Sequence, residues 1–118
     1  MRENNVIWTV EGKIKSGMRA DLDSLMAEMV GDVIKEEGTT NYEWTLAEDG
    51  ETLHVYERYA NTEEAKKHLV TWGRFAERFM SIVDVYEFVV FCDLAPELKE
   101  AVAGLNPKYM LPIGGFAK

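Results

Sequence analysis

The sequence predicts an α+β fold in which two helices pack on one face of a four-stranded antiparallel sheet. Three patterns support this prediction. Apolar residues recur at helical spacing in residues 22–34, apolar and polar residues alternate in residues 52–59, and residues 83–91 are almost continuously apolar. The chain has 118 residues, which is the length of one domain.

The first strand is predicted from Val6, where β-branched and aromatic residues follow one another, and it stops before Gly17. The helix after it is predicted from one face of apolar residues, which are Leu22, Leu25, Met26, Met29, Val30, Val33 and Ile34. Lys35 is expected in the last turn, where a positive charge complements the helix dipole, and Gly38 is the expected stop.

Residues 39–46 and 52–59 are predicted to form a hairpin. The Asp49-Gly50 pair between them tolerates the positive φ that a tight turn requires. Alternation places His54 on one face of the second of these strands. The opposite face carries Leu53, Val55, Glu57 and Tyr59.

The second helix is predicted to start at Asn61 or Thr62, either of which can cap it, and Gly73 is expected to kink or break it. Residues 83–91 then form the last strand. The resulting order, β-α-β-β-α-β, is the split βαβ or ferredoxin-like arrangement, in which both helices lie on one face of the sheet.

The apolar residues of the first and last predicted strands indicate that a second copy of the chain packs on the sheet. An antiparallel sheet with one face in water alternates apolar and polar residues, whereas residues 6–8 and 88–91 are apolar without interruption. Because the two helices cover only one face, we predict a homodimer in which the sheet of a second copy covers the other face.

Residues 94–118 are predicted to extend the domain formed by residues 1–93. Pro96 suits the first turn of a short helix, and Gly104 suits its end. The tail that follows is rich in large apolar side chains, which is unlike a disordered segment. We therefore expect the tail to dock, either on its own subunit or across the dimer.

The composition excludes several classes of function. Thirteen Lys and Arg face twenty-one Asp and Glu, and the formal net charge of −8 leaves no basic surface for nucleic acid. A single cysteine, Cys92, excludes an intramolecular disulfide. The chain shows neither a signal-peptide core nor a run of about 20 apolar residues, so we expect a cytoplasmic protein that does not enter a membrane.

Two motifs lie on either side of the predicted hairpin turn. Residues 36–44 hold a Glu-Gly turn and a Tyr-containing strand, and residues 56–69 hold a Glu near a strand end and an Ala-x-x-His helix. Together they resemble the antibiotic biosynthesis monooxygenase (ABM) family, over roughly residues 6–91. The resemblance implies a ferredoxin-like fold paired as a homodimeric α/β barrel, and an activity like that of the members that oxygenate aromatic quinols and anthrones without a cofactor.

The chain departs from the family pattern at two places. Many members carry a second His shortly after the first, where this chain reads Thr-Trp-Gly-Arg at residues 71–74. Haem-degrading relatives use an Asn, a Trp and a His where this chain has Val10, Leu69 and Phe79. The resemblance therefore disfavours haem degradation.

His68 and Glu57 are the candidate catalytic pair. His68 is expected on the sheet-facing side of the second helix, and Glu57 lies near the end of the preceding strand. A nearby carboxylate raises a histidine pKa and fixes its tautomer, so in a pocket the pair could remove a phenolic proton, with His68 as the base or the orienting residue. The alternative is a structural hydrogen bond that joins the helix to the strand.

Six aromatic residues are candidates for the wall of a flat apolar cavity, or else for ordinary core: Trp8, Tyr42, Trp44, Trp72, Phe75 and Phe79. Arg74 and Arg78 are one helical turn apart and could bind a ligand carboxylate or face solvent. His54 is expected at the dimer interface or the surface.

No cofactor or metal is predicted, because the sequence lacks histidine pairs at metal-binding spacing and a dinucleotide phosphate loop. The predicted function is a cofactor-independent monooxygenase acting on a small aromatic substrate such as a quinol or an anthrone. The alternatives are a non-catalytic homodimer that binds a small apolar molecule, or one whose pocket is filled by its own side chains.

Overall fold

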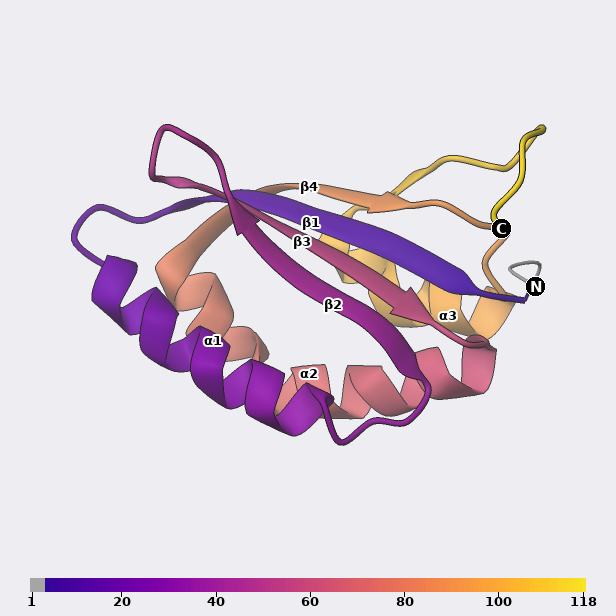
Figure 1. The fold of residues 1–118 in the computed structure, drawn as a ribbon, viewed down its shortest axis with the longest axis horizontal. Coiled ribbons are helices and arrows are strands. Elements are labelled where there is room, and N and C mark those ends of the chain that lie inside the picture. Colours follow the sequence, from indigo (N-terminus) through magenta and orange to yellow (C-terminus); the bar gives the residue numbers. More distant parts are fainter. Residues whose placement is uncertain (1–3) are drawn as a thin grey trace.

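The computed structural model describes residues 4–118, and its elements follow the predicted β-α-β-β-α-β order (Figure 1). The elements are β1 (Val6–Ile14), α1 (Arg19–Val33), β2 (Thr39–Leu46), β3 (Thr52–Tyr59), α2 (Thr62–Ile82) and β4 (Val83–Val90), then α3 (Pro96–Val102), η1 (Ala103–Leu105) and β5 (Lys108–Tyr109). The predicted ferredoxin-like α+β class is confirmed. Residues 1–3 of the predicted domain 1–93 lie outside the described residues.

The sheet has five strands rather than the four predicted, in the order β2-β3-β1-β4-β5. The first four are antiparallel, and β5 runs parallel to β4. Asn106 adopts a left-handed conformation with φ of 54°, which turns the chain back toward β4. The Met110 amide then donates to the Val90 carbonyl at 2.8 Å. A strand of two residues is too short to produce a periodic sequence pattern, which explains why it was missed.

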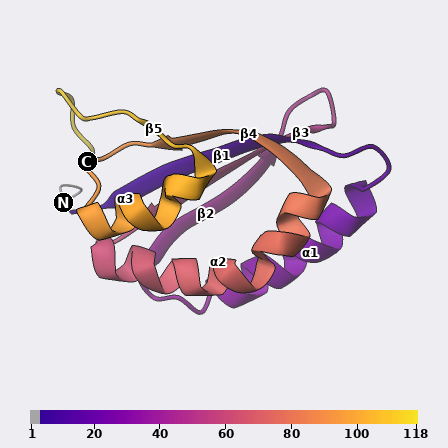
Figure 2. The ribbon, with the colours of Figure 1, turned by 180° about the vertical axis from the view of Figure 1, so that it is seen from behind.

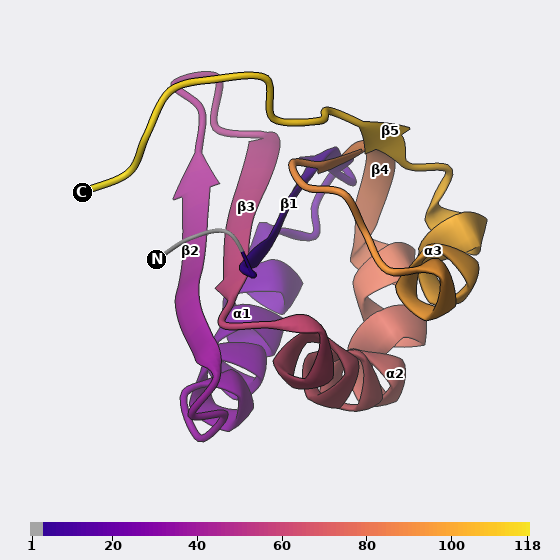
Figure 3. The same cartoon turned by 90° about the vertical axis from the view of Figure 1, so that its right-hand side faces the viewer.

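All three α-helices lie on one side of the sheet, as the view from behind and the end view show (Figures 2 and 3). α1 and α2 cover the middle and one edge, and α3 packs near β1 and β4, where Leu98 and Val102 join Trp8 and Val90 in the core. Within residues 4–118, no helix combines the length and the hydropathy that crossing a bilayer requires.

α1 buries a narrower stripe than its sequence predicted. Its buried residues are Leu22, Leu25, Met29 and Val33, whereas Ile34 is 80% exposed. The helix ends at Val33, so Lys35 lies beyond its last turn rather than within it. The chain then turns into β2 through a short segment that contains Glu36.

α2 is one continuous helix of 21 residues, so it does not break at Gly73; of the predicted kink or break only a bend is present, which turns the second half of the helix toward β4 (Figure 2). The side chain of Asn61 caps its first turn by accepting a hydrogen bond from the Glu64 amide at 3.0 Å. Gly73 lies on the exposed side, where a Cβ would meet no atom within 4 Å. The buried residues on the other side, among them His68 and Phe79, fix the helix to the sheet despite the glycine.

Gly12 lies where β1 shifts register against β4. A Cβ at this position would lie 2.7 Å from the Asp84 carbonyl oxygen and 2.7 Å from a Val83 methyl group. Glycine therefore permits the close approach of the two strands at this bulge.

The tail after β5 crosses the side of the sheet that faces away from the helices (Figure 3). Its apolar side chains are exposed, including Ile113 and Phe116. A groove of about 990 Å³ separates the tail from the chain around Ile7 and Phe91. The tail is thus not packed into the core of its own chain, and docking across a dimer stays a prediction.

Candidate active site

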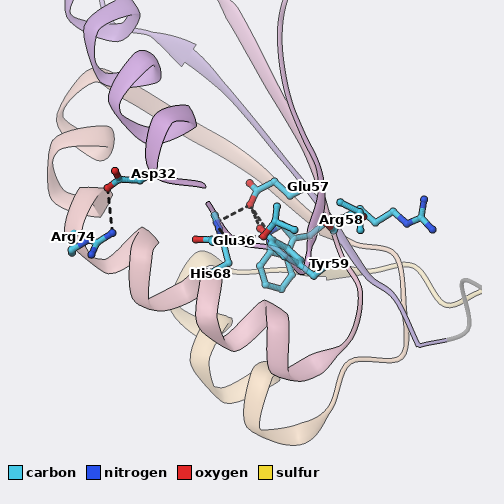
Figure 4. Close-up of polar contacts among 10 residues, drawn as sticks. Asp32, Glu36, Glu57, Arg58, Tyr59, His68 and Arg74 are labelled. Carbon is cyan, nitrogen blue, oxygen red and sulfur yellow. Dashed lines mark hydrogen bonds and ion pairs between the residues drawn. The ribbon is translucent and has the colours of Figure 1, made fainter. Parts of the chain in front are cut away.

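A buried polar cluster joins the helices to the sheet, with His68 at its centre (Figure 4). His68 Nδ1 lies 3.0 Å from Glu36 Oε1, and His68 Nε2 lies 3.2 Å from Glu57 Oε1. His68 is 3% exposed and Glu57 is 7% exposed. The predicted proximity of His68 and Glu57 is therefore present, and Glu36 adds a second carboxylate that the sequence analysis did not identify.

Local structure explains how the three side chains meet. Alternation along β3 points Glu57 toward the helices, together with the buried Val55 and Tyr59. His68 follows Ala65 by three residues on the buried face of α2. Glu36 lies in the turn between α1 and β2, where the Thr39 hydroxyl donates to its Oε1 at 2.6 Å.

Glu57 is held firmly through one of its two oxygens. Oε1 accepts a hydrogen bond from the Trp8 indole at 3.0 Å and another from the Tyr59 hydroxyl, and it faces His68 Nε2. None of these contacts uses Oε2. Because Glu57 also lines the cavity described below, Oε2 is free to accept a proton or a hydrogen bond from a ligand.

The two carboxylates determine the charge of His68. Burial by itself lowers the pKa of the imidazole, but hydrogen bonds to Glu36 and Glu57 and the charges of both outweigh this effect and raise the pKa to about 9. The Glu36 pKa is lowered: burial opposes ionisation, and the hydrogen bonds from His68 and Thr39 more than compensate. At neutral pH His68 is therefore an imidazolium, held between the side chains of Glu36 and Glu57.

This charge state has a chemical consequence. An imidazolium whose two N–H groups face carboxylates has no lone pair with which to accept a proton. Of the two roles considered for His68, the geometry thus favours the orienting role over that of the base. The free oxygen of Glu57 is the better placed proton acceptor.

A cavity of about 40 Å³ lies beside this cluster, between the sheet and α2. Five of the six predicted aromatic residues line it, which are Trp8, Tyr42, Trp44, Trp72 and Phe79. Phe75 does not; it packs against the core cluster around Leu25 and Met29. The exposed Met80 and the half-buried Leu105 also line the cavity.

Aromatic rings that line the cavity contact one another in pairs. The distance between ring centroids is 5.3 Å for Trp72 and Phe79 and 5.8 Å for Tyr42 and Trp44. It is 5.6 Å for Trp8 and Phe88. Edge-on and tilted contacts of this kind hold rings in fixed orientations. The cavity wall is therefore mostly aromatic and apolar, which suits an aromatic ligand.

The remaining candidates lie away from the cavity. Arg74 pairs with Asp32 and Arg78 pairs with Glu28, in exposed contacts of 3.3 Å and 2.7 Å that connect α2 to α1 (Figure 4 shows the first). His54 lies on the opposite face of β3 from Glu57, as alternation predicted. Among residues 4–118, no group of three or more His, Cys, Asp or Glu side chains is arranged to hold a metal ion.

Sequence reasoning missed Glu36 and Tyr59 as members of the cluster. Tyr59 was placed on the face that carries Glu57, so its hydroxyl could have been proposed as a donor from the strand pattern alone. Glu36 belongs to the Glu-Gly turn of the family motif. Its position depends on where α1 ends, which a sequence pattern locates poorly.

The fold and the site together define a ferredoxin-like domain that encloses an aromatic cavity beside a buried carboxylate–imidazolium cluster. The sequence pattern of the antibiotic biosynthesis monooxygenase family matches residues 6–72, which is more than half of the chain. The chain belongs to this family.

Solved structures agree with this assignment. The chain is similar to MupZ from Pseudomonas fluorescens, with a TM-score of 0.86 and 15% identity over 98% of this chain and 95% of that one. It is also similar to SnoaB, a cofactor-independent oxygenase from Streptomyces nogalater, with a TM-score of 0.66 and 10% identity over 78% of this chain and 95% of that one. At these identities the likeness establishes the fold alone.

Among curated proteins, vomeronasal secretory protein 2 of Mus musculus is 23% identical over 90 residues. The match covers 76% of this chain and 49% of that protein. The chain thus spans about half the length of this curated relative.

Proposed function

We propose that this protein is a cofactor-independent oxygenase of a small aromatic substrate, with Glu57 as the proton acceptor. The observation that carries the proposal is the Glu57 carboxylate, which is buried, fixed through Oε1 and free at Oε2, and which lines an aromatic cavity. Membership of the family supports the oxygenase chemistry.

The reaction begins when a substrate in the cavity transfers an acidic proton to Glu57 Oε2. The His68 imidazolium stays in place and keeps the Glu57 side chain oriented, while Glu36 fixes the other ring nitrogen. The resulting carbanion is electron-rich and reacts with dioxygen. For an anthrone-like CH₂ carbon, one oxygen atom becomes a new carbonyl and the other leaves as water with the two hydrogens.

Substrate entry requires movement of side chains, because a cavity of about 40 Å³ holds only a few water molecules. Met80 and Leu105 line the cavity and are not fully buried, so we propose that these side chains move. We therefore expect a substrate with several rings to widen the cavity at this end.

The test is oxygen uptake by the purified, metal-stripped protein with a panel of quinols and anthrones, alongside Glu57→Gln. We expect uptake above autoxidation, reduced about 100-fold or more in this variant. Glu28→Gln is the matched control, because it makes the same substitution at an exposed ion pair. Absence of uptake by the unmodified protein, or full uptake by Glu57→Gln, contradicts the proposal.

A second candidate is a protein that binds a small apolar molecule without turnover. It is favoured by the closed arrangement of the cluster, in which both His68 nitrogens and Glu57 Oε1 already have partners. Saturable binding of a panel compound without oxygen uptake would support this candidate over the oxygenase.

We also propose that the protein is a homodimer. The exposed apolar residues of the tail, with the exposed Phe91 after β4, support this assembly, whereas Val6, Ile7 and Trp8 are already buried within one chain. Light scattering at micromolar concentration should give twice the chain mass of 13.5 kDa. A mass equal to that of one chain contradicts the dimer.

A further inference from the structure

Within residues 4–118, one residue that lines the cavity lies outside the β-α-β-β-α-β part of the fold. This residue is Leu105, in η1, whereas the other lining residues all lie in the elements from β1 to β4. Leu105 is half-buried and packs against the core cluster that contains Trp8 and Phe88, which also line the cavity. The segment after β4 therefore contributes to the candidate site as well as to the core.

This segment is anchored on both sides of Leu105. Before it, Leu98 and Val102 of α3 are buried in the same core cluster. After it, β5 pairs with β4 (Figure 2). The Lys99 ammonium lies 5.4 Å from the centre of the Tyr109 ring, so α3 and β5 also contact each other. The backbone at Leu105 thus cannot move far without breaking one of these contacts.

Met80, the other lining side chain that is proposed to move, differs from Leu105 in its freedom. It lies near the end of α2 and is 40% exposed. An unbranched thioether chain has more rotamers than a leucine side chain and adapts to irregular spaces. We therefore expect Met80 to yield to a ligand, and Leu105 to limit how far the cavity can extend.

The segment after β4 is also a part in which structures of this fold differ. β4 ends at Val90, about three-quarters of the way along the chain. The likeness to MupZ covers 98% of the chain and the likeness to SnoaB 78%, so the part without a counterpart in SnoaB has about the length of residues 91–118. A wall residue from this segment is thus one way in which proteins of this fold can differ in the ligands they accept.

We propose that Leu105 is a specificity-determining residue that limits the substrate to two fused aromatic rings. This inference rests on the proposed function and narrows its substrate to a two-ring quinol rather than a three-ring anthrone. The cavity of about 40 Å³ has to widen for any aromatic compound, and each further ring requires a larger displacement. Fused rings do not bend, so the wall has to move instead. A branched side chain in an anchored segment resists this displacement, because overpacking a dense interior is unfavourable.

The test compares binding of 1-naphthol with binding of 9-phenanthrol, which has one more fused ring, by isothermal titration calorimetry. We expect the unmodified protein to bind 1-naphthol about 10-fold more tightly, although the larger compound has more apolar surface to bury. Leu105→Ala should abolish or reverse this preference, chiefly through tighter binding of 9-phenanthrol. The three tryptophans of the chain, Trp8, Trp44 and Trp72, all line the cavity. Shifts of their indole N–H resonances therefore show that a ligand occupies it.

Two further variants separate the size limit from a general effect on packing. Leu111→Ala is the matched control, because it makes the same substitution in the same segment at an exposed residue that does not line the cavity. It should leave the preference unchanged. Leu105→Phe keeps the core filled and narrows the cavity, so it should weaken 1-naphthol binding about 10-fold.

Several results overturn the size limit. They are absence of binding of both compounds, tighter binding of 9-phenanthrol by the unmodified protein, an unchanged preference in Leu105→Ala, unchanged 1-naphthol binding in Leu105→Phe, or binding that leaves the indole resonances unshifted. If the preference changes as expected but no compound consumes oxygen, the oxygenase proposal fails and the size limit stands. If oxygen is consumed and the preference is the same in Leu105→Ala, the size limit fails and the oxygenase proposal stands.

Discussion

His68 acts in this structure as a charged link between elements rather than as a free imidazole. Its two nitrogens connect the turn after α1 to β3 through Glu36 and Glu57. The helix and strand periodicities brought His68 and Glu57 together correctly in the sequence analysis, because each depends only on spacing within one element. The partnership with Glu36 depends on a turn, and no spacing rule predicted it.

The raised pKa of His68 predicts how the free energy of unfolding depends on pH. A folded-state pKa of about 9, against the ordinary 6.5, stabilises the fold fully below pH 6.5 and loses this contribution as the pH rises through 9. The loss is on the order of 3 kcal/mol. Because the Glu36 pKa is lowered, its contribution is present above pH 4.5 and is lost at lower pH.

Urea unfolding at pH 6 and at pH 9.5 measures this effect, with His68→Gln as the comparison. The unmodified protein should be less stable at the higher pH, and the variant should change much less. Equal pH dependence in the two proteins would show that His68 is not the titrating group.

The effect of Glu57 on the His68 pKa should be measurable by titration of His68. The chain has two histidines, so the imidazole proton resonances of His68 and His54 can be assigned with one His54→Asn variant. Glu57→Gln removes one negative neighbour, and we expect the His68 pKa to fall by about 1 unit or more in an NMR titration. An unchanged His68 pKa in Glu57→Gln would mean that Glu36 alone keeps the imidazole protonated.

Helices and strands whose apolar residues recur at regular spacing were predicted well. Features that do not follow from such spacing were not. β2 and β3 have the predicted bounds, because alternation and the turn at Gly50 define them clearly. The sequence left a kink and a break at Gly73 as alternatives, and α2 does not break there, because packing of the helix on the sheet outweighs the low helix propensity of one glycine. β5 depends on the left-handed Asn106 and on an available edge of β4, and both are features of the folded chain.

Two glycine substitutions should have opposite effects on stability. Gly73→Ala places a methyl group where no atom lies within 4 Å and should stabilise the protein by about 0.5–1 kcal/mol. Gly12→Ala brings a methyl group against the Asp84 carbonyl and should destabilise the protein by about 1–3 kcal/mol. Urea unfolding of both variants measures the difference, and a stable Gly12→Ala protein would show that the bulge can open.

At the scale of the whole molecule, the tail contains large apolar side chains that a single chain does not cover. Ile113 and Phe116 are exposed beside a groove of about 990 Å³, on the side of the sheet without helices. Because these residues are apolar, the sequence analysis predicted that the tail docks on a protein surface rather than being disordered. In the proposed dimer these residues would contact a second copy, whose surface the sequence pattern of one chain does not define.

Removing residues 111–118 should therefore weaken the proposed dimer. We expect light scattering to show dissociation at a higher protein concentration than for the full chain, and the double variant Ile113→Ser, Phe116→Ser to behave similarly. Ala117→Ser is the control, because it changes an exposed tail residue without removing a large apolar side chain. A dimer of unchanged strength would indicate that the tail has another role, such as covering the cavity opening.

The short strand β5 has a consequence for the aggregation of this protein. It occupies the edge of β4 at Val89 and Val90, within four consecutive apolar residues at positions 88–91. An open edge of that composition is a template on which strands of other molecules add. A chain ending at residue 105 should therefore form thioflavin-positive fibrils or precipitate on storage, whereas a chain ending at residue 110 keeps β5 and should stay clear.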